Sequence, residues 1–246
     1  EMRSPDHIAV KYYKDYRSGS AKTLKSIQIT LAARLEKFNL SSVAALTATD
    51  ELDLASLGEK KVALFALIPD NDSSFNFLVS LLYASTFQEL FYSADRVHGG
   101  SLPVPVHFLM DEFANVSLPD DFDKLLATMR SRNISVSIII QNIAQLKALY
   151  EKQWESIMGN CDEFLYLGGN ETSTHKLISE NYLGKSTLWL DTYGKSTGHS
   201  GSYSTNNQIT GRELLTPDEV RMLDNNLALL FIRGEAPLMD EKYDLL

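Results

Sequence analysis

The amino-acid sequence predicts an α/β fold with a mainly parallel β-sheet, on the strength of two observations. Five short runs are rich in apolar residues, at positions 62–68, 106–110, 134–140, 163–167 and 227–232. Segments in which apolar residues recur at helical spacing lie between most of these runs. Apolar strands that alternate with helices favour a parallel sheet with helices on both faces. The carboxyl ends of the strands are then expected at one edge of the sheet.

The predicted helices follow from spacing and from capping residues. The segment 75–93 is apolar almost all round, which predicts a largely buried helix. Apolar residues recur every three or four positions near 121–132 and 143–158, and a short helix is expected at 174–182. Ser73 or Ser74 is expected to cap the first of these helices. Thr216-Pro-Asp-Glu219 has the pattern of a capping box with proline in the first turn, so another helix is expected to begin there. Residues 196–207 hold almost no large apolar side chain, which predicts a flexible loop.

The N-terminal part of the chain has a different pattern. Residues 6–38 show helical spacing, with a break predicted at Ser18-Gly-Ser20, and no strand is indicated before residue 62. We therefore expect an all-α part at 1–57 and an α/β domain at 58–246. Through Asn39 there are eight Lys and Arg against four acidic residues, a local charge of +4. This basic face either contacts DNA phosphates or is an ordinary solvated helix face.

Composition excludes several classes of protein. The net charge is −9, which excludes a generic basic DNA-binding module, and one cysteine excludes an internal disulfide framework. No apolar run is long enough to span a membrane, and the N-terminus lacks a signal-peptide pattern. The chain does not begin with Met, so we expect it to be part of a longer protein.

The most informative stretch is Val104-Pro-Val-His-Phe-Leu-Met-Asp-Glu-Phe-Ala-Asn115. Its apolar strand ends abruptly in Asp111 and Glu112, and an unpaired buried carboxylate is costly. Two acids at a strand end therefore indicate a site at the carboxyl edge of the sheet. In nucleotide-hydrolysing motors the first acid holds Mg²⁺ through water, and the second orients the water that attacks the γ-phosphate. The alternative is an ordinary strand followed by a helix-capping aspartate.

Gln141 follows the next predicted strand and is expected beside the two acids. A glutamine after three isoleucines is unusual in a core and suits a sensor of the γ-phosphate. An amide that caps the following helix is the alternative. Asp111, Glu112 and Gln141 are thus predicted to contact ATP and Mg²⁺, with Asp111 as the metal-holding residue.

The phosphate-binding loop of such a site is absent from the sequence. Its pattern, Gly-x-x-x-x-Gly-Lys-Ser/Thr, places backbone N–H groups around the phosphates. Gly184-Lys-Ser186 and Gly194-Lys-Ser196 match only in part, because Ser179 and Trp189 stand where the first glycine is required. We interpret both as turns and expect the missing half of the site upstream of residue 1.

Several segments together resemble the TraG-type coupling proteins of conjugation and type IV secretion, most nearly those of Gram-positive conjugative elements. These segments are Pro5-Asp-His-Ile-Ala-Val-Lys-Tyr-Tyr-Lys14, Ala21-Lys-Thr-Leu-Lys-Ser26, Phe75-Asn-Phe-Leu-Val-Ser80, Asp111-Glu-Phe-Ala-Asn115, Ile157-Met-Gly-Asn-Cys-Asp162 and Leu167-Gly-Gly169. The resemblance spans almost the whole chain.

This resemblance implies a RecA-like P-loop motor domain with an inserted all-α domain, of which 1–57 would be the C-terminal part. It implies a hexameric ATPase that recruits relaxase-bound DNA and drives single-stranded DNA toward the secretion channel. The transmembrane helices and the Walker A motif would precede residue 1. The whole protein would lie at the cytoplasmic face of the cell membrane, and this chain alone would be soluble, cytoplasmic and inactive.

The resemblance also implies a role for an arginine near the end of a predicted helix. Arg130 matches the arginine finger that reaches the γ-phosphate of a neighbouring subunit, and Arg132 is the second choice. A solvated helix end is the alternative for both residues. For the whole chain, a related DNA or protein translocase and a non-catalytic module that docks protein cargo are the alternative functions.

Overall fold

The computed structural model describes residues 7–68, 73–115, 118–119, 121–195 and 203–244. It divides into two compact units, Glu1–Asp53 and Leu54–Leu246. The first unit contains the helices α1 (Ile8–Arg17), α2 (Ala21–Leu35) and α3 (Ser41–Leu46), with the 3-10 turn η1 (Glu36–Asn39) between the last two. The predicted break between two helices is confirmed, and Ser20 caps α2 by accepting a hydrogen bond from the backbone of Thr23.

The second unit begins with helical elements and a parallel pair of strands. These are η2 (Leu54–Gly58), η3 (Ser73–Phe75), α4 (Asn76–Tyr92), η4 (Ser93–Val97), β1 (Val106–Met110), η5 (Phe113–Asn115), α5 (Phe122–Met129), η6 (Arg130–Arg132) and β2 (Ile134–Ile138). The unit continues with α6 (Ile143–Leu149), α7 (Trp154–Gly159), β3 (Glu163–Tyr166), α8 (Thr172–Leu177), η7 (Ile178–Leu183), β4 (Lys185–Lys195), β5 (Tyr203–Glu213), α9 (Pro217–Arg221), β6 (Leu227–Ile232) and β7 (Leu238–Glu241).

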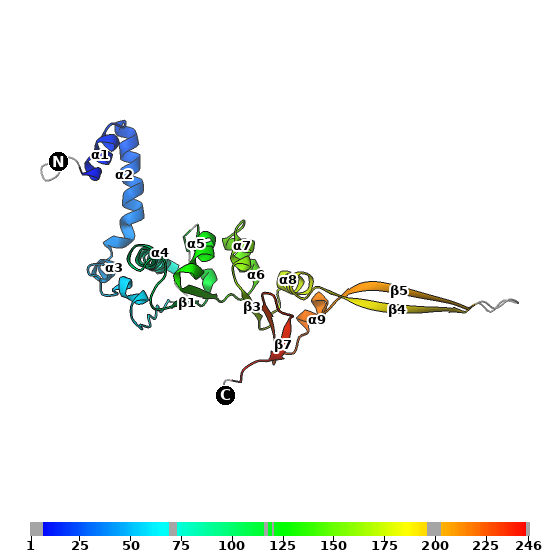
Figure 1. Ribbon diagram of the computed structural model, residues 1–246. Coiled ribbons are helices and arrows are strands. Elements are labelled where there is room, and N and C mark those ends of the chain that lie inside the picture. The colour runs from blue at the N-terminus through cyan, green and yellow to red at the C-terminus, as the bar shows by residue number, and fades with distance from the viewer. Residues whose placement is uncertain (1–6, 69–72, 116–117, 120, 196–202, 245–246) are drawn as a thin grey trace. The chain divides into compact units, whose positions relative to one another are not determined.

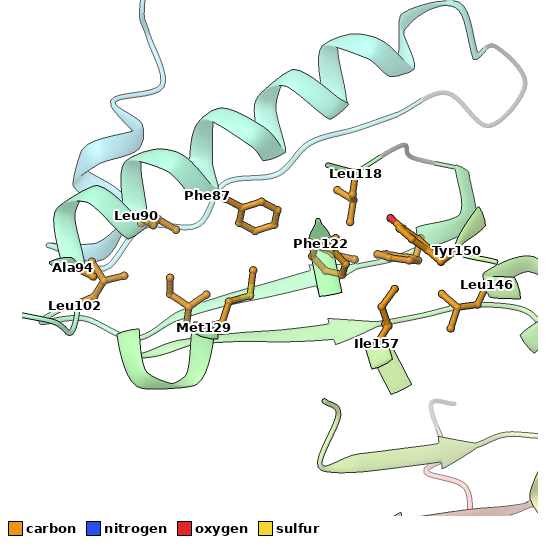
Figure 2. Packing of buried hydrophobic residues seen from close by; sticks show 13 residues of the cluster. Phe87, Leu90, Ala94, Leu102, Leu118, Phe122, Met129, Leu146, Tyr150 and Ile157 are labelled. Atoms are coloured by element: carbon orange, nitrogen blue, oxygen red, sulfur yellow. The ribbon is translucent and has the colours of Figure 1, made fainter. Parts of the chain in front are cut away.

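The parallel pair β1–β2 is covered by an aromatic core. Val106 to Met110 pair in register with Ile134 to Ile138. Phe87 of α4, Phe122 of α5 and Phe113 of η5 pack together over these strands, with ring centroids 6.0 Å apart for Phe87–Phe122 and 5.6 Å for Phe113–Phe122. Figure 2 shows this packing. Burying one such ring contributes roughly 1.5–3 kcal/mol, so these helices hold the ends of β1 and β2 in place.

A second core packs around the antiparallel sheet β3–β6–β7. Its centre is formed by Tyr166, Ile178, Val220, Leu229 and Phe231, all of them buried. The capping box predicted at Thr216 is confirmed, since the Thr216 side chain accepts from the backbone of Glu219 and the Glu219 side chain accepts from the backbone of Thr216. Helix α9 is thereby fixed against this core through Val220.

Two strand predictions differ from the structure. Residues 62–68 form no strand among the described residues, and Phe65 and Leu67 are 83% and 95% exposed. Strand β3 pairs antiparallel with β6, so the expected single edge of carboxyl ends holds only for β1 and β2. An apolar run is typical of a buried strand but does not say which strand pairs with it or in which direction, so the parallel direction expected for 163–167 was wrong.

The predicted loop at 196–207 also differs, because residues 203–207 belong to β5. Strands β4 and β5 form a long antiparallel hairpin (Figure 1). The expected turn at Gly194-Lys-Ser196 is wrong in part, since Gly194 and Lys195 lie in β4 and residue 196 lies outside the described residues. The hairpin could not be predicted from the sequence, because its strands are rich in Ser, Thr and Asn and lack the regular alternation of apolar and polar residues that indicates a strand.

Helix boundaries shift for local reasons. The expected helix 143–158 is two helices, since Tyr150 leaves the helical conformation between α6 and α7. Helix α8 begins two residues before the expected Thr174, because the Glu171 side chain caps it. Ser73 and Ser74 lie in η3, and Phe75 occupies the N-cap position of α4 without a side-chain hydrogen bond.

Candidate functional site

Two backbone hydrogen bonds join the chain segments that follow the carboxyl ends of β1 and β2. The backbone N–H of Ile139 donates to the Met110 carbonyl at 3.0 Å, and the N–H of Phe113 donates to the Ile139 carbonyl at 3.1 Å. Asp111 and Glu112 form the turn enclosed by these two bonds. The two predicted acids therefore lie directly beside the end of β2, as expected for neighbouring parallel strands.

Glu112 has an unusual backbone conformation. Its φ is +48°, in the left-handed region that residues other than glycine rarely occupy. Oδ1 of Asp111 accepts a hydrogen bond from the Glu112 backbone N–H at 3.0 Å, which stabilises the tight turn. Strained backbone of this kind is common at functional sites, where neighbouring contacts hold it. Here the turn directs two consecutive carboxylates from the end of one strand.

Gln141 contacts Glu112 directly. Nε2 of Gln141 donates to the Glu112 carboxylate, at 3.1 Å from Oε1 and 3.4 Å from Oε2. The two residues are 29 positions apart in the chain and meet because β1 and β2 are parallel neighbours. A hydrogen bond to an ionised carboxylate is stronger than one between neutral groups. The sequence-based expectation that Gln141 lies beside the two acids is confirmed.

Gln141 is not the cap of the helix that follows it, so that alternative is wrong. Asn142 is the N-cap of α6, and its side chain accepts from the backbone N–H of Gln145 at 3.0 Å. The Gln145 side chain in turn accepts from the backbone N–H of Gln141 at 3.2 Å and donates to the Gln141 Oε1 at 3.4 Å. Asn142 and Gln145 thus fix the turn on which Gln141 stands. The capping residue before an apolar helix was the signal in the sequence that could have found Asn142.

Arg130 lies away from these residues within the same chain. It precedes β2, whereas Gln141 follows it, and β2 is five residues long, or about 16 Å. The Arg130 side chain is 87% exposed and reaches Asp162 only at 3.8 Å. Asp162 is paired more closely with Arg233, at 2.9 Å. Such a long, exposed ion pair contributes little, so the Arg130 side chain is held only weakly within its own chain.

Arg132, in contrast, is held inside its own unit. Nε and Nη2 donate to the two carboxylate oxygens of Asp95, both at 2.9 Å. The guanidinium also lies over the Phe91 ring, 4.6 Å from its centroid. The hydrogen bond from Arg132 lowers the pKa of Asp95, which keeps that carboxylate ionised as a partner. These contacts give Arg132 a structural role.

The residues of the acidic turn, Asp111 and Glu112, fit a magnesium ion that is bound together with a nucleotide. No cluster of three or more His, Cys, Asp or Glu side chains with metal-binding geometry occurs among the described residues. Mg²⁺ bound with a nucleotide typically keeps several waters and uses one or two carboxylates together with phosphate oxygens. Asp111 is exposed at the strand end and provides one such carboxylate. The residues present therefore fit Mg²⁺ bound with a nucleotide, and they do not form a cage made of protein ligands alone.

The two partial matches to a phosphate-binding loop lie elsewhere. Gly184 ends η7 with φ +70°, and Lys185 opens β4. Among the described residues, neither match connects a strand to a following helix, as a phosphate-binding loop must. In the described part of the chain, no helix is long and apolar enough to cross a membrane.

Comparisons with known proteins agree with one another. Residues 4–244 match the family described as type IV secretory system conjugative DNA transfer. Protein VirD4 of Rhizobium rhizogenes is 24% identical over 202 residues, which are 80% of this chain and 29% of that protein. Conjugal transfer protein TraG of Rhizobium radiobacter is 25% identical over 168 residues, 65% of this chain and 25% of that protein. The chain thus spans less than a third of the length of these curated relatives.

Solved structures of a bacterial conjugative coupling protein share the fold. The unbound form of TrwBdeltaN70 aligns with a TM-score of 0.54 at 16% identity, over 68% of this chain and 37% of that one. TrwB in complex with the non-hydrolysable ATP analogue ADPNP aligns with a TM-score of 0.52 at 14% identity, over 68% of this chain and 36% of that one. The predicted α/β, RecA-like fold class is confirmed by this likeness. Since the family match covers nearly the whole sequence, the chain belongs to the type IV secretory system conjugative DNA transfer family.

Proposed function

We propose that this chain is the part of a conjugative coupling ATPase that carries the acidic half of the nucleotide site. The observation that carries this function is the hydrogen bond between Glu112 and Gln141 at the shared end of two parallel strands. It places an acid that can orient water beside an amide that can contact a phosphate. TrwB, whose fold is similar, has been solved with ADP and Mg²⁺.

In this function each residue has a distinct task. Bound Mg²⁺–ATP supplies a γ-phosphoryl group with its charge partly neutralised. Asp111 would hold the ion through water, and Glu112 would orient the attacking water and accept its proton. Gln141 contacts the phosphate or the attacking water with one end of its amide and the protein with the other. The Glu112–Gln141 hydrogen bond holds these two side chains next to each other.

Arg130 acts on a neighbouring subunit in this proposal. Its position at the opposite end of β2 from Gln141 excludes action on its own site, and its exposed side chain fits contact across a subunit boundary. An arginine at such a boundary stabilises the negative charge that develops on the transferring phosphoryl group. A closed ring of subunits, a homo-hexamer in the whole protein, provides that boundary.

The partners follow from the family rather than from the geometry. We propose that the whole protein lies at the cytoplasmic face of the cell membrane, recruits a relaxase bound to DNA, and moves single-stranded DNA toward the proteins of the type IV secretion channel. ATP hydrolysis at the site described above drives this movement. We further propose that residues 1–57 are part of an all-α domain inserted in the motor and that 58–246 are motor domain.

The test is Glu112→Gln in the whole protein that carries this chain. ATP affinity, measured by titration, should stay within a few-fold, and turnover should fall at least about 100-fold, since a positioned general base contributes 10²–10⁴. Glu155→Gln, on the exposed surface of α7, is the matched control and should turn over normally. Turnover at the unmodified rate in Glu112→Gln would exclude this function for the acidic turn.

A further inference from the structure

The start of α6 is tied to a distant helix by a buried hydrogen bond. The first N–H groups of a helix have no partner within the helix. The N–H of Ile143, the first residue of α6, donates to Oγ1 of Thr174 in α8 at 3.2 Å, across 31 positions of the chain. Ile143 and Thr174 are 2% and 8% exposed. Water cannot replace this bond easily, so its loss would leave a buried N–H without a partner.

Glu171 fixes the direction of the Thr174 hydroxyl. Oγ1 of Thr174 donates to Oε2 of Glu171 at 2.6 Å. The same carboxylate accepts from the backbone N–H groups of Ser173 and Thr174 at 2.8 and 2.9 Å and from the Ser173 hydroxyl at 2.8 Å. Partial burial acts to raise the pKa of Glu171, but these hydrogen bonds outweigh it and lower the pKa to about 2. A carboxylate that stays ionised only accepts, so the Thr174 oxygen presents a lone pair to Ile143.

The bond to Ile143 lies two residues from Gln141. Between them, Asn142 caps α6, and Gln145 in its first turn is bonded to both the backbone and the side chain of Gln141. The direction of the Gln141 amide toward Glu112 therefore depends on where the first turn of α6 stands. A fixed first turn aims the amide, whereas a turn that shifts would lengthen the 3.1 Å bond to Glu112.

We propose that Thr174, held by Glu171, is a positioning residue that aims Gln141 at Glu112. It does not contact the acidic turn; it acts by fixing the first turn of α6. Its catalytic consequence rests on the proposed function, but its effect on the Gln141 side chain does not. We call the hydrogen-bonded set Glu171, Thr174 and Ile143 the brace. The brace joins the turn after β3, where Glu171 lies, to the turn after β2, where Gln141 lies.

The first experiment observes Gln141 without any nucleotide. In ¹H–¹⁵N spectra of this chain, the side-chain amide of Gln141 is assigned by its loss in Gln141→Ala. Thr174→Val keeps the volume of the side chain and removes the hydroxyl, so the Gln141 amide signals should move toward those of a solvent-exposed glutamine. Thr174→Ser restores the hydroxyl and should return them. Ser179→Ala removes another buried hydroxyl, which donates to the Leu215 carbonyl, and should leave the Gln141 signals in place.

The second experiment measures turnover in the whole protein. Thr174→Val should lower kcat about tenfold with KM for ATP within about twofold, because misplacing a positioned group affects the chemical step more than binding. Thr174→Ser should recover most of kcat. If the unmodified whole protein hydrolysed no ATP, the proposed function would fail while the spectra still tested the brace.

Two results would overturn the proposal. One is an unchanged Gln141 amide in folded Thr174→Val, and the other is an equal shift in Ser179→Ala. If Thr174→Val does not fold, Glu171→Gln replaces it, because an amide can donate as well as accept and no longer fixes the direction of the Thr174 hydroxyl. Glu171→Gln should shift the Gln141 signals in the same direction by a smaller amount, and unchanged signals there would equally contradict the proposal.

Discussion

Gln141 has contacts on both sides that a helix-capping amide would not need. Its side chain reaches Glu112, and its backbone is bonded to Gln145 in the first turn of α6. Gln141→Ala should therefore leave ATP affinity within a few-fold and lower DNA-stimulated turnover of the whole protein by about tenfold or more. Gln153→Ala, in the segment between α6 and α7, is the control. Loss of ATP binding in Gln141→Ala, or an unchanged rate, would exclude a sensor role.

The two arginines of η6 should separate activity from stability. Arg130→Ala should abolish turnover of the whole protein with little change in its stability, because its side chain is 87% exposed. Arg132→Ala should destabilise the chain by about 1–2 kcal/mol, because it loses a cation–π contact with Phe91 and a hydrogen bond to the Thr128 carbonyl. Urea unfolding and turnover of both variants provide the measurement. The opposite pattern would move the finger role to Arg132.

Glu171 should leave a signature in acid stability. Its pKa in the folded chain is about 2, against an ordinary 4.5. A carboxyl whose pKa is lower in the folded state stabilises that state fully above pH 4.5, and this contribution is lost as the pH falls toward 2. In Glu171→Gln, urea unfolding should therefore depend less on pH across this window than in the unmodified chain. Glu155→Gln, on α7, is the control; an identical slope in Glu171→Gln would contradict the brace.

At the scale of elements, the meeting of the site residues at the ends of the parallel strands β1 and β2 could be predicted from the sequence. Asp111, Glu112 and Gln141 converge because β1 and β2 run in the same direction, and the apolar runs with polar ends indicated both strands. The antiparallel direction of β3 against β6 was not predictable, because the apolar sequence of one strand does not show which strand it pairs with or in which direction. Thr174 was equally hidden, because its contact with Ile143 joins elements that only tertiary packing brings together.

The β4–β5 hairpin has little support from a core. Its side chains are exposed wherever the structure describes them from Lys185 to Tyr193 and from Asn207 to Arg212. Such a hairpin contributes little stability of its own. Its base is tied down by Leu214, whose N–H donates to the Gly184 carbonyl at 3.1 Å, and by Ser179, which donates to the Leu215 carbonyl at 2.6 Å.

Shortening this hairpin should therefore leave the unit folded. Joining Ser186 to Arg212, which pair across the hairpin, by an Asn-Gly turn should change the free energy of unfolding by no more than about 0.5 kcal/mol. Ser179→Ala at the base should cost about 1–3 kcal/mol, since it leaves the partly buried Leu215 carbonyl without its donor. Urea unfolding followed by circular dichroism compares the two. A loss in the shortened chain as large as in Ser179→Ala would mean that the hairpin packs on the unit.

At the scale of the molecule, the proposed nucleotide site is divided between the acidic residues that this sequence contains and the phosphate-binding loop that it lacks. The acidic turn and Gln141 are in place, but the sequence has no Gly-x-x-x-x-Gly-Lys-Ser/Thr motif. That motif supplies the backbone N–H groups and the lysine that bind the phosphates. Asp111 and Glu112 alone would repel the negative phosphates. The chain by itself is therefore expected to bind ATP very weakly.

The isolated chain should accordingly release no phosphate from ATP above the background of the buffer. The measurement is phosphate release at saturating Mg²⁺ and ATP, with the same assay on the whole protein as the positive control. Arg130 adds a second reason, because it lies at the opposite end of β2 from Gln141 and cannot complete a site within its own chain. Glu112→Gln of the isolated chain is the matched variant. Phosphate release by the chain that disappears in this variant would show that the acidic turn is sufficient without a phosphate-binding loop, and would contradict the division of the site.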